Sequence, residues 1–152
     1  AALQLEITES RFVAYLRRAR AALDELRAVG VMIAIDDFGT GYSSLSYLKR
    51  LPVDVLKIDK SFLDTLDSVD ADVAIVAAVI TMGHALGMKV TAEGVERVEQ
   101  ADLLRDLGCD SAMGWLWSAA LTPAELAKCA LVGFPMAGGD TGAVVLPMRA
   151  RA

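Results

Sequence analysis

One pattern recurs along this 152-residue chain and limits its fold: a short run rich in β-branched residues, a polar or acidic end, and a helical segment that ends at glycine. The runs that we expect to form strands begin near Leu3, Val31, Val53, Lys89 and Ala112. After the last run, Thr122-Pro123-Ala124-Glu125 has the form of a capping box with proline at the first helical position. Strands that alternate with helices predict a parallel sheet built from βα units.

Five units leave two architectures open. A (β/α)8 barrel takes about 250 residues, or roughly 30 per unit, so a chain of this length matches five of the eight units. The sequence also lacks an initiator methionine and opens inside an expected strand. We therefore expect an α/β fold, a partial (β/α)8 TIM-like barrel of about the last five βα units, over residues 1–132, and an irregular tail over residues 133–152. The alternative is a complete five-stranded doubly wound sheet, which the same alternation permits.

Composition and charge restrict the partners of the chain. Hydrophobic residues make up 55% of it, which is enough to bury a sizeable core, and the formal net charge of −5 argues against nucleic acid or an anionic membrane as a partner. The two cysteines have no paired spacing, and no secretory signal or transmembrane segment is visible. We therefore expect a cytoplasmic location, although a neighbouring part of a longer protein could carry a membrane anchor.

Charged side chains stand at the carboxyl ends of four successive expected strands: Glu6, Asp36 with Asp37, Lys57, and Glu93. This is the face on which barrel enzymes place their chemistry. Packed carboxylates repel one another unless cations neutralise them, and oxygen ligands without histidine or thiolate indicate Mg²⁺ or Mn²⁺. The pattern predicts a two-metal phosphodiester hydrolase in which a lysine orients the attacking water or neutralises charge.

Five segments of the chain carry motifs that stand in the order of one known family. They are Leu5-Glu-Ile-Thr-Glu-Ser10, Asp36-Asp-Phe-Gly-Thr-Gly-Tyr-Ser-Ser44, Leu56-Lys-Ile-Asp-Lys-Ser-Phe62, Ala92-Glu-Gly-Val-Glu96 and Gly108-Cys-Asp110. Together they resemble the EAL-domain family of cyclic di-GMP phosphodiesterases, over about residues 3–126. The resemblance implies a barrel that binds two Mg²⁺ or Mn²⁺ ions and opens cyclic di-GMP to linear pGpG in bacterial signalling.

The same resemblance implies a role for each residue at the strand ends. Glu6 and Asp36 would be ligands of the first metal, with Asp36 bridging the two ions and Asp37 holding the second. Glu93 would support the second metal and its water, and Lys57 would assist the attacking water. The chain gives no indication of which other residues bind substrate.

Further implications concern the loop after Asp37 and the partners of the protein. Glu9 would brace the glycine loop that follows Asp37, which the family uses to link metal binding and dimer contacts. Besides cyclic di-GMP, the implied partners are a second copy of the chain and upstream regulatory or GGDEF-type domains in the parent protein. We expect a homo-oligomer, because a partial barrel leaves unpaired strand edges that a second copy could cover.

The chain also departs from the family pattern. The Glu-Ala-Leu motif and the asparagine ligand of the family precede everything present here, so we expect a weak first metal site and an isolated chain that is weak or inactive. Met113-Gly114-Trp115 replaces the usual Gln-Gly-Tyr, and Ala119 stands at the arginine of Ser-Arg-Pro. Methionine cannot reproduce the hydrogen bonds of glutamine, and the lost arginine removes a possible phosphate contact.

Two alternatives to the enzyme therefore remain: a catalytically inactive module that binds cyclic di-GMP or a protein, and a truncated remnant that dimerises. For individual residues the plainer interpretation is preferred. We expect Trp115 and Trp117 to share one face of the last strand and to pack in the core. We expect Lys60 to be an ordinary solvated charge, His84 to be structural, and Cys109 to be a small buried apolar residue. For Glu96, a solvated turn acid or a charge at a helix N-terminus is preferred at least as much as a catalytic role.

Overall fold

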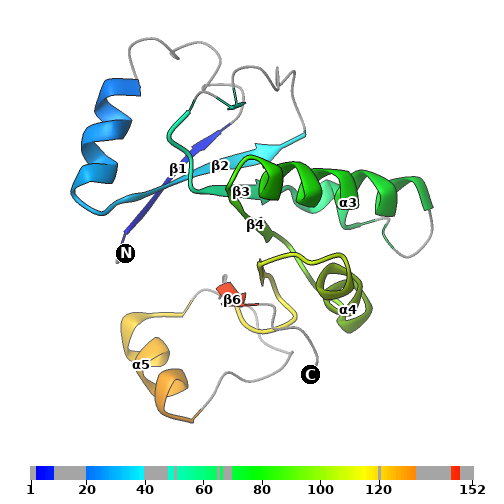
Figure 1. Ribbon diagram of the computed structural model, residues 1–152. Helices are drawn as coiled ribbons and strands as arrows, with labels where there is room; N and C mark the ends of the chain where they lie inside the picture. Colours follow the sequence, from blue (N-terminus) through cyan, green and yellow to red (C-terminus); the bar gives the residue numbers. More distant parts are fainter. Residues whose placement is uncertain are drawn as a thin grey trace.

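The computed structural model describes residues 3–8, 20–39, 48–49, 51–64, 66, 70–119, 121–132 and 145–147. These residues contain one sheet, whose strands are β1 (Gln4–Thr8), β2 (Met32–Phe38), β3 (Val55–Ile58), β4 (Lys89–Ala92), β5 (Ser111–Met113) and β6 (Val145–Pro147). The 3-10 turn η1 (Lys60–Phe62) follows β3. The helices are α3 (Asp70–Ala85), α4 (Val98–Asp106) and α5 (Pro123–Val132), and residues 20–28 form a further, unlabelled helical segment (Figure 1).

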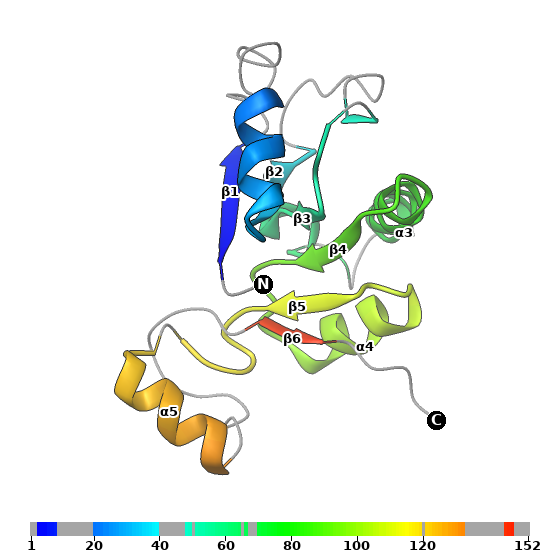
Figure 2. The ribbon, with the colours of Figure 1, turned by 60° about the vertical axis from the view of Figure 1, so that its left-hand side comes forward.

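The order of the strands in the sheet decides between the two expected architectures. The strands β1 to β5 lie side by side in the order of the sequence and are all parallel (Figure 2). A doubly wound sheet reverses its strand order at a switch point, whereas a barrel adds each strand next to the preceding one. The α/β fold with five successive parallel strands is therefore confirmed, and the doubly wound alternative is wrong.

Helices α3 and α4 cover one apolar face of the sheet. Helix α3 packs against β3 and β4 and buries Val76 and Ile80, and α4 buries Ala101 and Leu104. In the two ribbon views, α3 and α4 follow each other along the same side of β3 to β5 (Figures 1 and 2). Gly87, at φ 76°, follows the last turn of α3, and the N–H groups of Gly87 and Met88 donate to carbonyls of that turn. The chain then enters β4 at Lys89.

Buried branched side chains of β2 to β4 form the centre of the core. Ile33, Ile35, Leu56, Ile58 and Val90 are each at most 1% exposed. Burial of this kind, at about 25 cal/mol per Å² of apolar surface, is the main favourable contribution to folding. No helix in the described part of the chain is long and apolar enough to span a membrane.

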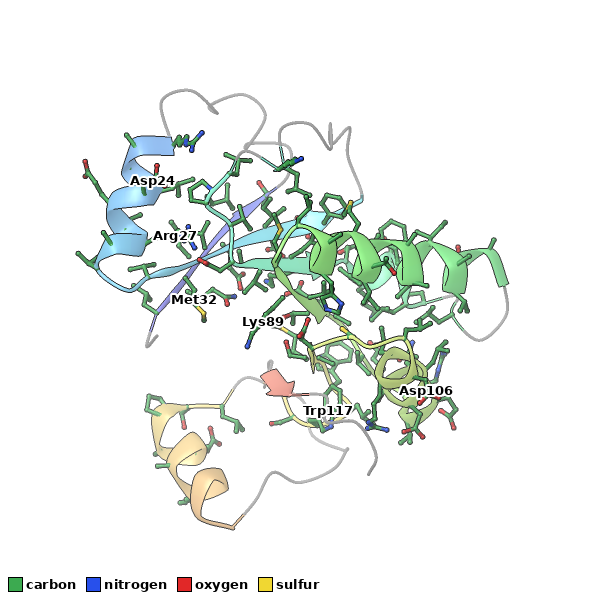
Figure 3. The ribbon with its side chains drawn as sticks, in the orientation of Figure 1. Asp24, Arg27, Met32, Lys89, Asp106 and Trp117 are labelled. Carbon is green, nitrogen blue, oxygen red and sulfur yellow. The ribbon has the colours of Figure 1, made fainter. Side chains whose placement is uncertain are left out.

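A partly exposed ion pair lies at the amino ends of β2 and β3. Arg27, from the helix over residues 20–28, donates to Asp54 Oδ1 at 2.6 Å, and the other oxygen of Asp54 accepts the backbone N–H of Ile33 at 2.9 Å. Arg27 lies between this helix and the start of β2 in Figure 3. The contact fixes the amino ends of β2 and β3, on the opposite side of the sheet from the predicted site.

The predicted start of the last helix is confirmed. Thr122 N donates to Glu125 Oε2 at 2.7 Å, and Glu125 N donates back to Thr122 Oγ1 at 3.4 Å, which is the reciprocal pair of a capping box. Helix α5 begins at Pro123, whose fixed φ suits the first helical position.

Two differences from the expected elements occur near the end of the chain. The fifth strand ends at Met113 rather than continuing to Trp117, because Gly114 leaves the strand conformation and a turn follows. Within residues 133–152, which we expect to be irregular, the described residues Val145–Pro147 form β6, antiparallel to β5. The Val-Val-Leu run at this point is rich in strand-forming residues and supplies a partner for the edge of β5.

Candidate active site

A β-bulge in β2 sets the geometry of the site. Ile35 pairs with Leu56 and Phe38 pairs with Ile58, so two residues of β2, Asp36 and Asp37, stand opposite the single residue Lys57 of β3. Asp37 has φ 56°, the left-handed conformation that aspartate tolerates better than most residues. In a regular strand two consecutive side chains point to opposite faces of the sheet. The bulge breaks this alternation at Asp36 and Asp37 and changes the direction in which the strand presents its side chains.

Lys57 is the centre of a charged cluster that three neighbouring strand ends build around it. Its ammonium Nζ lies 2.7 Å from Glu6 Oε2 and 3.0 Å from Asp36 Oδ1, and it also pairs with Glu93. Lys57 itself is only 3% exposed. A buried ammonium is stable only when it is paired, so the three carboxylates determine where the side chain lies.

The cluster shifts the pKa of several of its members. Burial alone would lower the pKa of Lys57, but hydrogen bonds to Glu6 and Glu93 and the Asp36 carboxylate outweigh it, and the pKa of Lys57 is raised well above its ordinary value. Burial raises the pKa of Glu93, and Lys57 offsets only part of this rise. Burial and the neighbouring Asp36 and Asp59 carboxylates raise the pKa of Asp37. Lys57 therefore remains an ammonium throughout the neutral pH range.

A cavity of about 660 Å³ opens in front of this cluster. Its lining comprises the charged cluster, two backbone glycines and a wall of side chains from the segments after β3, β4 and β5. The lining residues are Glu6, Asp36, Lys57, Lys60, Glu93, Gly94, Glu96, Met113, Gly114 and Trp115. The volume is within the range of small-molecule and cofactor pockets, and its position is at the carboxyl ends of the strands.

The far wall of the cavity contains Lys60, Glu96 and Trp115, for which the plainer interpretation was preferred. Lys60 Nζ lies 2.5 Å from Glu96 Oε1 and 5.3 Å from the centre of the Trp115 ring. Trp115 is 60% exposed, whereas Trp117 is 8% exposed. The expectation that both tryptophans pack in the core from one strand face is wrong for Trp115, and Lys60 and Glu96 form part of the pocket wall rather than isolated surface charges.

Gly114 explains why the aromatic side chain takes this position. A Cβ at Gly114 would lie 2.1 Å from the carbonyl oxygen of Val95, so the two backbones approach more closely than any other residue allows. Val95 N donates to Met113 O at 3.0 Å, and Leu116 N donates to Val95 O at 3.0 Å. The glycine between two large side chains was the available sequence signal for a break in the strand.

The structure gathers four of the predicted site residues at one point and places the others differently. Glu6, Asp36, Lys57 and Glu93 line the cavity. Asp37 is adjacent to them through its charge interactions but does not line the cavity. Glu9, predicted to brace the glycine loop, lies outside the described residues, as does most of that loop.

The carboxylates of the cluster are of the chemical type that binds divalent metal ions. In this structure they surround the Lys57 ammonium instead. All candidate ligands are carboxylate oxygens. The buried Asp36 Oδ1 lies 3.0 Å from Lys57 Nζ, but among the residues that the structure describes it accepts no hydrogen bond of good geometry, so this oxygen could accept a further ligand. Within the same residues, no three acidic, histidine or cysteine side chains are close enough together to hold one ion. The Lys57 ammonium takes the place of a counter-ion for the carboxylates.

Fold and site together define a class: a barrel-type α/β domain with an acidic, lysine-centred pocket at the carboxyl ends of its strands. The model of the EAL domain matches residues 1–120 of this chain. The chain therefore belongs to the EAL-domain family.

Relatives agree with this assignment. The bifunctional diguanylate cyclase/cyclic di-GMP phosphodiesterase MucR of Pseudomonas aeruginosa is 48% identical over 123 residues, which are 81% of this chain and 18% of MucR. The crystal structure of the EAL domain of Mycobacterium smegmatis DcpA has a TM-score of 0.80 at 47% identity, and the match covers 87% of this chain and 59% of that one. A manganese/cy-diGMP complex of Klebsiella pneumoniae BlrP1 has a TM-score of 0.70 at 31% identity and covers 97% and 33%.

The lengths of these matches define what the chain represents. It spans between 15% and 18% of the length of four curated relatives that it matches, and 59% of the DcpA EAL-domain chain. The similarity is thus to one part of larger signalling proteins.

Proposed function

We propose that the chain is part of a metal-dependent phosphodiesterase domain that hydrolyses cyclic di-GMP to linear pGpG. The observation that carries this proposal is the Lys57 ammonium, held by carboxylates of three strand ends at the bottom of a 660 Å³ cavity. The names of MucR and of the BlrP1 complex support the choice of substrate and of a divalent cation such as Mn²⁺.

The residues divide between binding metal and positioning water. Glu6, Asp36 and Asp37 would hold Mg²⁺ or Mn²⁺, which when bound would polarise the phosphate and acidify a water. Lys57 keeps its proton at neutral pH, so it acts as a hydrogen-bond donor and a positive charge rather than as a base. Burial raises the pKa of Glu93, so its carboxylate accepts a proton more readily than an ordinary glutamate does.

An anionic dinucleotide can enter this acidic pocket only if cations meet it. Lys57 lies at the bottom and Lys60 on the wall, and both already interact with carboxylates. Divalent ions on the carboxylates would reverse the local charge and favour a phosphodiester. We therefore expect substrate binding to depend on the metal.

A second candidate function is binding of cyclic di-GMP without hydrolysis. Met113 lines the cavity at the position where the family usually has glutamine, so this wall offers a thioether in place of an amide. A pocket that keeps its shape and loses polar contacts to substrate could retain affinity while it loses turnover.

Chromatography of the products from cyclic di-GMP and Mn²⁺ tests the proposal, with Asp36→Asn as the inactive variant and Asp24→Asn as the matched control. Asp24 is an exposed carboxylate on the helix over residues 20–28 (Figure 3), and it is not among the residues that line the cavity. We expect slow formation of pGpG by the unmodified chain and by Asp24→Asn, and none by Asp36→Asn, because a carboxylate that would hold the metal is lost.

Equal turnover by all three proteins would refute the two-metal site. Metal-dependent binding of cyclic di-GMP without any product from the unmodified chain would favour the binding module instead. Calorimetry with the same three proteins separates these results.

A further inference from the structure

The turn η1, directly after the strand that carries Lys57, has hydrogen bonds at both of its ends. Asp59 Oδ1 accepts hydrogen bonds from Ser61 N at 3.0 Å and Ser61 Oγ at 2.5 Å, which caps the first turn. At its other end Leu63 is fully buried, and its carbonyl accepts a hydrogen bond of 2.8 Å from the buried side chain of Gln100. A turn fixed at both ends can position the side chains that it carries.

One of these side chains, Phe62, lies against the residue that follows the β2 bulge. A Cβ built on Gly39 would lie 2.7 Å from both Cε2 and Cζ of the Phe62 ring. Gly39 also has φ 101°, so a side chain would be strained there even without the ring. The ring therefore occupies the space that any other residue at this position would need.

A second side chain of the same turn makes the equivalent contact on the other side of β3. A Cβ on Gly94, which follows β4, would lie between 2.6 and 2.8 Å from Cβ, Cγ and Cδ of Lys60. The turn after the middle strand thus packs onto a glycine after each neighbouring strand. On one side that glycine ends the Asp36-Asp37 bulge, and on the other it follows Glu93.

We propose that Phe62 is a positioning residue, which holds Gly39 and thereby fixes the bulge that presents Asp36 and Asp37 opposite Lys57. The bulge is bounded by the pair Phe38–Ile58, only one residue before Gly39, so a shift of Gly39 would be transmitted to it directly. Tight packing makes such a contact restrictive, because neighbouring atoms cannot move independently. Its consequence for metal binding rests on the proposed function, but the effect on the bulge does not.

The test combines amide hydrogen exchange by NMR with titration of Mn²⁺, on the full chain and on Phe62→Ala. In the metal-free protein we expect the amides of residues 36–39 to exchange at least about fivefold faster in Phe62→Ala, through local opening. If the unmodified chain binds Mn²⁺, we expect its affinity to fall by about tenfold, as when a residue that orients ligands is lost.

Met82→Ala is the matched control, because Met82 is a half-buried apolar side chain that packs on the same core from α3. It should lower global stability without a selective effect on residues 36–39 or on Mn²⁺ affinity. If Phe62→Ala does not fold, Phe62→Leu, which keeps apolar volume but not the ring, should show the same selective exchange in smaller measure.

The two measurements separate the two proposals. Unchanged exchange at residues 36–39 in a folded Phe62 variant overturns the positioning role, whatever the metal does. Faster exchange with unchanged Mn²⁺ affinity, in a chain that binds the ion, supports the hold of Phe62 on the bulge and contradicts Asp36 and Asp37 as the metal ligands. Selective exchange in a chain that binds no Mn²⁺ supports the role of Phe62 in the bulge and contradicts the proposed metal site.

Discussion

Lys57 and Lys60 are three residues apart, both pair with glutamate, and both border the same cavity, yet their environments differ. Lys57 is 3% exposed and has three carboxylates from different strand ends around it. The Lys60 side chain is 44% exposed and has one glutamate partner and a tryptophan ring. A charge that is buried among several partners determines the structure around it, whereas an exposed pair contributes little to stability.

The largest loss of stability is expected for Lys57→Met, and comparison with Lys60→Met tests whether burial distinguishes the two lysines. Removal of the ammonium leaves three partly buried carboxylates that repel each other. We expect the free energy of unfolding to fall by about 3 kcal/mol, the low end for an unpaired buried charge, because the carboxylates retain some exposure. Lys60→Met should cost less than about 1 kcal/mol. Urea unfolding at neutral pH, where both lysines are charged, measures the two values.

Equal losses in the two variants would show that burial does not distinguish the lysines. The result would also indicate that water reaches Lys57 and screens its pairs, contrary to the exposure that the structure gives.

The next effect concerns the backbone on which the Trp115 wall rests. Gly114→Ala should cost about 2 kcal/mol, because the added methyl group meets the Val95 backbone and the chain must shift. Gly87→Ala is the matched control: Gly87 also has positive φ, but a Cβ there meets nothing within 4 Å. It should show only the conformational cost, about 1 kcal/mol. Thermal unfolding of both variants measures the difference.

If Gly87→Ala were as costly as Gly114→Ala, conformational strain alone would account for both and the close approach to Val95 would contribute nothing. The wall would then depend on its side-chain contacts rather than on the backbone beneath them.

The smallest effect is the salt dependence of the two lysine pairs. In double-mutant cycles, the coupling of Lys60 with Glu96 should fall clearly between about 0.05 and 1 M NaCl, because the Debye length shrinks to about 3 Å. The coupling of Lys57 with Glu93, whose side chains are 4% and 21% exposed, should change less. Parallel losses in both cycles would contradict a difference in screening.

Residue periodicity predicted the parts of the fold that depend on local chemistry. The alternation of strands and helices and the capping box at Thr122 followed from propensity and hydrogen bonding within a few residues. The grouping of Glu6, Asp36, Lys57 and Glu93 followed from their shared place at strand ends. The bulge that sets Asp36 and Asp37 opposite one lysine could not be predicted, because it depends on the register between β2 and β3.

The tryptophan wall was missed for a related reason. Strand periodicity assigned Trp115 and Trp117 to one face, but the strand ends at Met113 where Gly114 meets the Val95 backbone. A contact between segments separated by many residues leaves no periodic signal in either one. Likewise, the sequence around Lys60 indicated a surface charge, because its partner Glu96 lies 36 residues later, in the segment after β4.

The amide of Gln100 has a consequence for which sequences can keep this pocket. Its oxygen accepts the N–H groups of Glu96 and Arg97, at 2.9 and 3.0 Å, while its nitrogen donates to Leu63 O. Glutamate has the same shape and could accept both N–H groups, but it would turn a negative oxygen toward the Leu63 carbonyl. A design that chooses this residue by size and polarity alone would treat glutamine and glutamate as equal. Only the amide both accepts the N–H groups of Glu96 and Arg97 and donates to the Leu63 carbonyl.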